Sequence, residues 1–372
     1  MAQADGEVYL DWNATAPPLP AVTEAVAAAL REAWGNPASV HGTGRRARAA
    51  VEDARDALAA LLGVDARDVI FTSGGTEANN LGLAGACGLA TSRLEHPSVV
   101  RVAEQLEAAG APVAWLPVTR GGLLDVDGVT AALEHLPRRS TVAVAAVNHE
   151  TGVIQPLSEV ARCAWNAGAR LHVDAVQAVG KVDPAVYAEA DSLVVAAHKI
   201  RGPKGIGALV WRGGGPPRPV LVGGAQERGL RPGTQDAAAC AGFRVAIEHA
   251  RGGPARYERL AAQRDRLEAA LLVRGQRNGD PDRRAPHVTN VSVDGWLGDE
   301  LVVALDLEGV RVSSGSACSA GTAEPSPVVT AMVGAERARR AVRISLGETT
   351  RPDEIDRVLA ALARVLDNGG AA

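Results

Sequence analysis

The chain has 372 residues, of which 47% are hydrophobic and 22% are charged, and its formal net charge is −4 at pH 7. This composition excludes a disordered chain, and the length allows two globular domains. The charge is too small and too evenly mixed for a nucleic-acid surface, and the apolar runs are too short to span a membrane. We therefore expect a cytoplasmic protein of enzyme size that binds neither nucleic acid directly nor a membrane.

Short apolar runs alternate with helical segments between residues 45 and 211, which predicts an α/β domain whose parallel or mixed sheet is covered by helices. The predicted strands cover residues 69–72, 90–93, 113–116, 142–147, 170–173, 192–197 and 207–211. The predicted helices between them cover residues 45–62, 77–88, 98–109 and 157–167. Seven strands favour one large domain.

The rest of the chain has a different pattern. Residues 212–233 are rich in glycine and proline and predict a long loop, which in a compact domain is more often functional than idle. A helix follows at 236–251, and then a pattern of helix, strand, helix, strand, helix, the last helix covering 352–366. We predict a large domain at residues 14–250 and a smaller α+β domain formed by residues 1–13 and 251–372.

Lysine use is unusual in this chain, because only three lysines stand against thirty-six arginines. Lys199 follows an apolar run, and Lys181 and Lys204 lie close to it in the sequence. Lysine can lose its proton and act as a nucleophile, whereas guanidinium stays charged. Lys199 is therefore the first candidate for covalent chemistry. The alternative is that all three lysines are surface or anion-contact charges.

The four cysteines lie far apart without paired spacing, so we expect a reducing compartment, no disulfide framework and no metal site. Cys87, Cys163 and Cys240 lie in alanine-rich, helix-like sequence and are predicted to be small core residues. Cys318 lies in a run of small residues, 313–322, that predicts a loop. A thiol in such a loop is accessible and can move.

Two further motifs follow predicted strands. Residues 71–80 lead from a strand through two glycines into a helix, so the backbone N–H groups near Gly75 and Thr76 can bind a phosphate, although glycine before a helix is also common capping. Asp174 directly follows an apolar strand, with Gln177 three residues later. A buried acid needs a cationic partner. The alternative for Asp174 is a helix N-cap.

A phosphate site, a buried carboxylate and a strand-end lysine, in this order, resemble the pyridoxal 5′-phosphate (PLP) enzymes of the aspartate-aminotransferase fold. The motifs are more specific than the fold and resemble the cysteine desulfurases, which belong to the class-V aminotransferases, from residue 10 to about residue 347. The motifs are Leu10-Asp-Trp-Asn-Ala-Thr15, Gly35-Asn-Pro-Ala-Ser39, Phe71-Thr-Ser-Gly-Gly-Thr-Glu77, Glu95-His96, Asn148-His-Glu-Thr-Gly152, His172-Val-Asp-Ala-Val-Gln177, His198-Lys199, Gly202-Pro-Lys-Gly-Ile-Gly207, Glu227-Arg-Gly-Leu-Arg231, Ser313-Ser-Gly-Ser-Ala-Cys318 and Val342-Arg-Ile-Ser-Leu346.

The resemblance implies a role for each matching residue that faces the cofactor. Lys199 would hold PLP as a Schiff base, Asp174 would pair with the pyridine nitrogen, and Gln177 would bond the phenolic oxygen. His96 would stack on the ring and assist proton transfer, and His149 stands where an asparagine beside the cofactor is common. The phosphate would be held by Gly75, Thr76, His198 and, from the second subunit of the family's homodimer, Thr234.

The resemblance also implies the substrate and the reaction. L-Cysteine would be bound through its carboxylate by Arg343, in a pocket that Asn13, Thr15 and Asn148 complete. The Cys318 thiolate would attack the substrate sulfur, leaving a persulfide on Cys318 and releasing L-alanine. The sulfur would then pass to an acceptor protein, which is an iron-sulfur scaffold, a tRNA-thiolation enzyme or a biosynthetic sulfur carrier. The gap from Cys318 to Glu324 resembles the subgroup with a long cysteine loop, which serves nitrogenase-type and housekeeping iron-sulfur assembly.

One departure from the family pattern bears on the cofactor, because Ala196 replaces a serine that usually contacts the phosphate. We therefore predict somewhat weaker cofactor retention. Rival functions are a PLP-dependent aminotransferase, a cystine or selenocysteine lyase, a catalytically silent sulfur-relay subunit, and a nucleotide-binding module.

Overall fold

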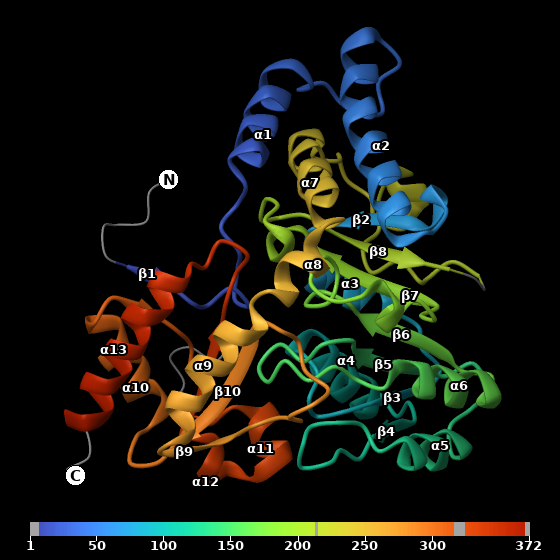
Figure 1. Cartoon of the computed structure of the whole chain (residues 1–372). Coiled ribbons are helices and arrows are strands. Elements are labelled where there is room, and N and C mark those ends of the chain that lie inside the picture. Colours follow the sequence, from blue (N-terminus) through green and yellow to red (C-terminus); the bar gives the residue numbers. More distant parts are fainter. Residues whose placement is uncertain (1–6, 213–214, 316–323, 369–372) are drawn as a thin grey trace.

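A seven-stranded sheet forms the centre of the larger part of the molecule (Figure 1). The computed structural model describes residues 7–212, 215–315 and 324–368. The strand order is β2-β8-β7-β6-β5-β3-β4, and β8 is antiparallel to both neighbours while the other pairs are parallel. The strands are β2 (Val69–Thr72), β3 (Leu89–Thr91), β4 (Val113–Trp115), β5 (Thr141–Ala145), β6 (Arg170–Asp174), β7 (Ser192–Ala196) and β8 (Gly207–Trp211).

The central strands are buried on both faces, as expected of parallel strands that helices cover on two sides. Val142 and Val144 of β5 pack into the largest apolar core, whereas Ala143 between them packs on the other face with Leu83 and Val99. The predicted fold class is therefore confirmed. All seven predicted strands are present, and their ends differ from the prediction by at most two residues.

In the described part of the chain, helices α1 to α7 accompany this sheet, and Figure 1 shows α1 and α2 extending beyond it to pack against α7. In α2, Ala47, Val51, Ala54 and Leu58 form the buried stripe of an amphipathic helix. The helices are α1 (Pro20–Glu32), α2 (Gly42–Leu62), α3 (Gly75–Leu83), α4 (Pro97–Ala108), α5 (Val126–Glu134), α6 (Leu157–Ala167) and α7 (Ala237–Ala250).

The prediction of a helix through residue 88 is wrong, because α3 ends at Leu83. Gly85 has a φ of 79°, a left-handed conformation that ends the helical path and that glycine adopts without steric cost. Cys87 consequently lies in the bend between α3 and β3 and is exposed, so the prediction of a core cysteine fails there. Cys163 is half-buried, and Cys240 is buried on α7.

A second apolar core lies beside the large sheet and contains Val8 and Leu10 from the start of the chain. Its three-stranded antiparallel sheet has the order β12-β10-β9, and β1 pairs with β11. The short strands β9 and β11 were not predicted, since two or three residues are too few to show a periodicity. The elements are β1 (Val8–Tyr9), α8 (Gly253–Glu258), α9 (Ala261–Leu272), β9 (Gly275–Arg277), β10 (Val288–Val293), α10 (Gly298–Leu307), β11 (Val310–Arg311), α11 (Pro327–Val333), α12 (Ala335–Ala338), β12 (Ala341–Ser345) and α13 (Pro352–Asn368).

The predicted loop at 212–233 contains a short 3-10 turn, Gln226–Gly229, that anchors the loop to α2 and β2. Glu227 is buried, and its two carboxylate oxygens accept hydrogen bonds from the Arg55 guanidinium of α2 at 2.9 and 2.7 Å. The backbone N–H of Phe71 donates to the same carboxylate. These contacts hold the loop close to the start of α3. In the ranges described, no helix is both long and apolar enough to cross a membrane.

Candidate active site

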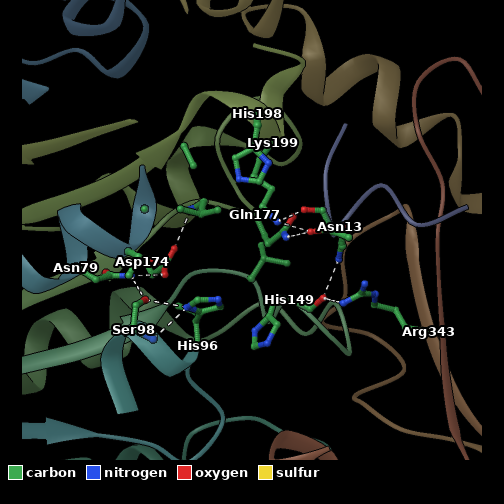
Figure 2. A pocket seen from close by; sticks show the side chains of 17 residues that line it. Asn13, Asn79, His96, Ser98, His149, Asp174, Gln177, His198, Lys199 and Arg343 are labelled. Carbon is green, nitrogen blue, oxygen red and sulfur yellow. Dashed lines mark hydrogen bonds between the residues drawn. The ribbon is translucent and has the colours of Figure 1, made fainter. Parts of the chain in front are cut away.

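A cavity of about 250 Å³ lies where β5, β6 and β7 end, and Ala145, Asp174 and Ala196 line it from those strand ends. Parallel strands bring their carboxyl ends to one edge of a sheet, which is where ligands bind in open α/β folds. Figure 2 shows Asp174, Asn79 and Ser98 on one side, Arg343 and Asn13 on the other, and Lys199 between them. The predicted site residues that line the cavity are Asn13, Gly75, Thr76, His96, His149, Asp174, Gln177, His198, Lys199 and Arg343.

Lys199 lies in the 3-10 turn Ala197–Ile200, directly after β7, and its side chain is half-buried. Its Nζ donates hydrogen bonds to the carbonyl oxygens of Asn13, at 2.5 Å, and Ala14, at 2.8 Å. The chain segment at Asn13 and Ala14, which precedes α1, thus holds the Lys199 amine at the cavity. This position suits an amine that reacts with a carbonyl compound in the cavity.

Asp174 ends β6, is only 7% exposed and faces the cavity. Its Oδ2 accepts a hydrogen bond from Asn79 Nδ2 at 2.8 Å, and its Oδ1 accepts one from the backbone N–H of Val176 at 3.0 Å. Within the described ranges, no ion pair joins Asp174 to a cationic side chain. A buried carboxylate of this kind fits a ligand with a protonated ring nitrogen.

The sequence reasoning assigned no role to Asn79, Ser98 and His172, which hold Asp174 and His96 in place. Asn79 Nδ2 donates both to Asp174 and to Ser98 Oγ, while Asn79 Oδ1 lies 3.0 Å from Nε2 of His172. Because the amide oxygen only accepts, His172 must carry a proton on Nε2. Burial lowers the pKa of His172 to about 4, so its ring is neutral at pH 7.

His96 caps the start of α4, and its ring lines the cavity. Its Nδ1 accepts a hydrogen bond from the backbone N–H of Ser98 at 3.1 Å and lies 2.8 Å from the Ser98 hydroxyl. Burial is the main cause that lowers the pKa of His96, although Asp174 opposes it. The ring is therefore neutral at pH 7, with its proton on Nε2, and it is able to relay protons.

The start of α3 forms the predicted phosphate site. Gly74 has a φ of 155° and a ψ of −174°, a region that essentially only glycine adopts, and Gly75 and Thr76 line the cavity. The first backbone N–H groups of a nine-residue helix therefore face the cavity and favour an anion. His198 also lines the cavity, with its Nδ1 3.1 Å from Thr15 Oγ1, and burial together with nearby lysines lowers the pKa of His198 to about 4.

Arg343, on β12, closes the opposite side of the cavity and is 1% exposed. Its guanidinium donates to Asp11 and, at 3.2 Å, to the backbone carbonyl of His149. Among the described residues, Arg343 Nε and His149 Nε2 are buried without a hydrogen-bond partner. Burial, and then His96, Arg343 and Lys199, lower the pKa of His149 far below its usual value. This side of the cavity thus holds a guanidinium that pairs with Asp11 but keeps an unsatisfied Nε, which fits a carboxylate ligand.

Gln177 lines the cavity, and its Nε2 donates to the carbonyl of Asn13 at 2.9 Å. Its Oε1 accepts a hydrogen bond from Lys181 Nζ at 2.6 Å. The alternative that all three lysines are surface charges does not hold for Lys181, which is only 1% exposed. Lys204 is exposed, as predicted.

Three predicted site residues within the described ranges do not line the cavity. Asn148 is buried, and its side chain bonds the turn at 150–151 and the carbonyl of Leu94 instead of facing a ligand. Thr15 is absent from the cavity lining, and its hydroxyl contacts His198 Nδ1. Thr234 is exposed and away from the cavity of its own chain. Cys318 and most of its loop lie outside the described residues.

The family model described as Aminotransferase class-V matches residues 8–358 of the chain. A cysteine desulfurase of Cereibacter sphaeroides is 42% identical to it, covering 97% of this chain and 96% of that protein. The cysteine desulfurase IscS of Dictyoglomus turgidum is 37% identical, covering 97% and 95%. A solved structure of a NifS-like protein has a TM-score of 0.88 at 31% identity and covers 97% of this chain and 100% of that one.

The chain therefore belongs to the class-V aminotransferases and, within them, to the cysteine desulfurase family, as the motifs predicted. This family depends on PLP.

Proposed function

We propose that this protein binds PLP and removes sulfur from L-cysteine, giving L-alanine and a persulfide on Cys318. The observation that supports the proposal most is the convergence of Lys199, Asp174 and the start of α3 on one cavity, with Arg343 on its opposite side. These groups come from separate parts of the chain and have the amine, carboxylate and anion-binding chemistry that this reaction needs.

The residues of the cavity fit PLP. Lys199 supplies the amine for its aldehyde, Asp174 the carboxylate for its ring nitrogen, and the N–H groups at Gly75 and Thr76 the phosphate site. When bound, the cofactor withdraws electrons from the substrate Cα, so that the carbon-sulfur bond can break. Asp174, already held by Asn79 and Val176, would place its carboxylate beside the ring nitrogen and favour the protonated form of that nitrogen.

The chain's own residues bind the substrate and move protons. Arg343 binds the substrate carboxylate in a two-pronged salt bridge, which fixes Cα near Lys199. The amine of Lys199 removes the Cα proton and later returns it, and His96 assists this transfer through Nε2. The neutral state of His96, produced by burial, suits this role.

Cys318 completes the reaction as a thiolate that attacks the substrate sulfur. A sulfur-sulfur bond forms, the carbon-sulfur bond breaks, and its electron pair stays on the carbon, which takes up a proton and becomes the methyl group of alanine. The described residues on both sides of the Cys318 loop bond Arg343, which lines the cavity, and Glu150, which follows the lining residue His149. Ser313 exchanges two backbone hydrogen bonds with Arg343, and the Ser326 hydroxyl bonds Glu150.

We further propose that the protein acts as a cytoplasmic homodimer in which Thr234 of the second subunit reaches the phosphate. The exposed position of Thr234 in its own chain supports this arrangement. The persulfide would pass to an acceptor protein, namely an iron-sulfur scaffold, a tRNA-thiolation enzyme or a biosynthetic sulfur carrier.

The proposal is tested with purified protein, PLP and L-cysteine. We expect a visible absorption band, borohydride trapping of the cofactor on the peptide that contains Lys199, and release of one alanine per sulfur transferred. Cys318→Ser is expected to lower sulfur transfer more than about 100-fold, the scale of losing a catalytic group, whereas Cys87→Ser at the exposed cysteine leaves it unchanged. Retained turnover in Cys318→Ser would favour a lyase. A coloured protein that releases no alanine would favour a silent relay subunit or an aminotransferase.

A further inference from the structure

Lys181 is a buried lysine that the proposed reaction does not use. It lies on the turn after β6, is 1% exposed, and has its Nζ 6.0 Å from the centre of the Tyr257 ring. In the part of the chain that the structure describes, no carboxylate forms an ion pair with it; its Nζ donates to Oε1 of Gln177 at 2.6 Å. Burying an amine without a counter-charge is costly, and a chain with so few lysines retains one here.

The hydrogen bonds of Gln177 fix which end of its amide faces the cavity. The carbonyl oxygen of Asn13 can only accept, so the group of Gln177 that faces it must be the amide NH2. The amide oxygen then points at Lys181, whose nitrogen has N–H donors in both its charged and its neutral form. We propose that Lys181 is a positioning residue that locks the Gln177 amide with its N–H donors toward the cavity.

This inference rests on the proposed function, in which Gln177 bonds the phenolic oxygen of PLP. That oxygen carries negative charge and needs a donor. A flipped amide would present oxygen to oxygen, which is repulsive. A donor bonded to the phenolic oxygen also makes that oxygen a weaker acceptor for the proton that it shares with the Lys199 nitrogen. The proton is then lost more easily, so the pKa of the cofactor-lysine linkage falls.

The backbone around Lys181 turns its side chain back toward Gln177. Gly180 has a φ of 71°, and a Cβ at that position would lie 2.9 Å from Cβ of Ala250 on α7. The backbone N–H of Lys181 donates to Ala178 at 3.0 Å, which closes the turn. The position therefore depends on glycine in a left-handed conformation.

Several titratable groups surround Lys181, so an electrostatic effect must be separated from the hydrogen bond. Burial first, and then Lys199 and Arg343, lower the pKa of Lys181 well below its usual value. Burial is the main cause that lowers the pKa values of His287 and His198, and Lys181 contributes to both; Tyr257 packs against Lys181. Loss of a nearby positive charge would raise the pKa of the cofactor-lysine linkage, the same direction as loss of the Gln177 donor.

A double-substitution cycle separates the two effects. The pKa of the cofactor-lysine linkage is measured from the pH dependence of the visible absorbance of the PLP-loaded protein. We expect Lys181→Met and Gln177→Met each to raise it by about one pH unit, a tenfold change in the equilibrium. If Lys181 acts through Gln177, the variant with both substitutions has the same pKa as Gln177→Met alone.

Lys204→Met is the matched control, because it removes the charge of the exposed lysine near His198 without touching Gln177, and we expect it to leave the pKa unchanged. Lys181→Met leaves the Gln177 oxygen unsatisfied and can unfold the protein. The double variant removes both partners and avoids that penalty, so its comparison with Gln177→Met remains decisive.

The possible outcomes distinguish failure of the positioning role from failure of the proposed function. An unchanged pKa in Lys181→Met, or a double variant whose pKa exceeds that of Gln177→Met by a further unit, overturns the positioning role. Absence of the visible band in the unmodified protein overturns the proposed function, and the inference with it.

Discussion

On the sheet side of the cavity, hydrogen bonds join Ser192, His172, Asn79 and Asp174 in one continuous chain, which Asn79 extends through Ser98 to His96. On the opposite side, Arg343 Nε, His149 Nε2 and Glu150 Oε1 are buried without a partner among the described residues. Buried polar groups are usually satisfied, so unsatisfied ones mark a place where a ligand or water completes the contacts. We call the first set the satisfied wall and the second the open wall.

The satisfied wall and the open wall suit two different tasks of the proposed enzyme. The satisfied wall holds Asp174 and His96 in fixed positions before any ligand arrives, which suits a cofactor that stays bound through many turnovers. The open wall leaves cationic and neutral nitrogen atoms for a carboxylate that binds and leaves in each turnover. Glu150 Oε1 lies 3.6 Å from His149 Nε2, too far for a hydrogen bond, and burial raises the pKa of this carboxyl.

Arg343→Met breaks the open wall and is expected to have the largest effect. A bidentate contact to a carboxylate joins two charge-assisted hydrogen bonds, so we expect kcat/KM for L-cysteine to fall about 100-fold, mostly through KM. The preference for L-cysteine over cysteamine, which lacks the carboxylate, should largely disappear. Steady-state kinetics with both amines measures this.

Cofactor content serves as the internal check, because the Arg343 guanidinium bonds Asp11 and the carbonyl of His149 on the side of the cavity away from Asp174, so the visible band should remain. Arg339→Met, at an exposed arginine two residues before β12, is the matched control. A variant Arg343→Met that still discriminates between the two amines would show that the open wall does not bind the carboxylate.

The satisfied wall is probed through pH. The folded pKa of His172 is about 4, below the value of 6.5 for an exposed histidine, because burial favours the neutral ring. The neutral ring's contribution to stability is therefore complete above pH 6.5 and is lost as the pH falls from 6.5 toward 4. Between pH 7 and pH 5 this group should remove about 2 kcal/mol from the free energy of unfolding.

Urea denaturation at pH 7, 6 and 5 measures the loss, and His172→Gln should reduce it by about the same amount. Other buried histidines contribute to the slope of the parent protein, so the difference between parent and variant is the decisive quantity. His135→Gln at an exposed position is the control. Equal slopes in the parent protein and His172→Gln would mean that His172 does not stay neutral in the folded state.

The sequence was sufficient for the fold and for the residues at strand ends. Contiguous apolar runs predicted every strand of the large sheet, and strand order then brought Asp174 and Lys199 to one edge. Glycine-rich sequence before a helix predicted the place of Gly75. The short strands β9 and β11 were missed because they show no periodicity.

The residues that support the site were harder to predict, although two carried a signal. His172 is a polar residue inside an apolar strand, and Asn79 lies four residues after Gly75 on the buried face of α3. A polar side chain within an apolar pattern indicates a buried hydrogen-bond network. The contact between Lys181 and Gln177 was not predicted, because a separation of four residues brings these two side chains together only through the turn that joins them. No such pattern could show which polar atoms remain unsatisfied.

Ala196→Ser is expected to have the smallest effect, since it adds one hydroxyl on the same side of the cavity as the satisfied wall. Ala196 ends β7, lines the cavity, and its Cβ lies 3.8 Å from where a Cβ on Gly75 would stand. A serine hydroxyl there reaches the region of the phosphate site, so we expect PLP to bind about fivefold more tightly, which corresponds to about 1 kcal/mol for one hydrogen bond.

Titration of the apo protein with PLP, followed by absorbance, measures the Kd. Ala197→Ser places the same hydroxyl one residue later, in the apolar core and outside the cavity lining, so it should lower stability without tightening the cofactor. If Ala196→Ser leaves the Kd unchanged, the missing serine does not weaken cofactor retention. In that case the phosphate is held by the α3 N–H groups and His198 without help from the end of β7.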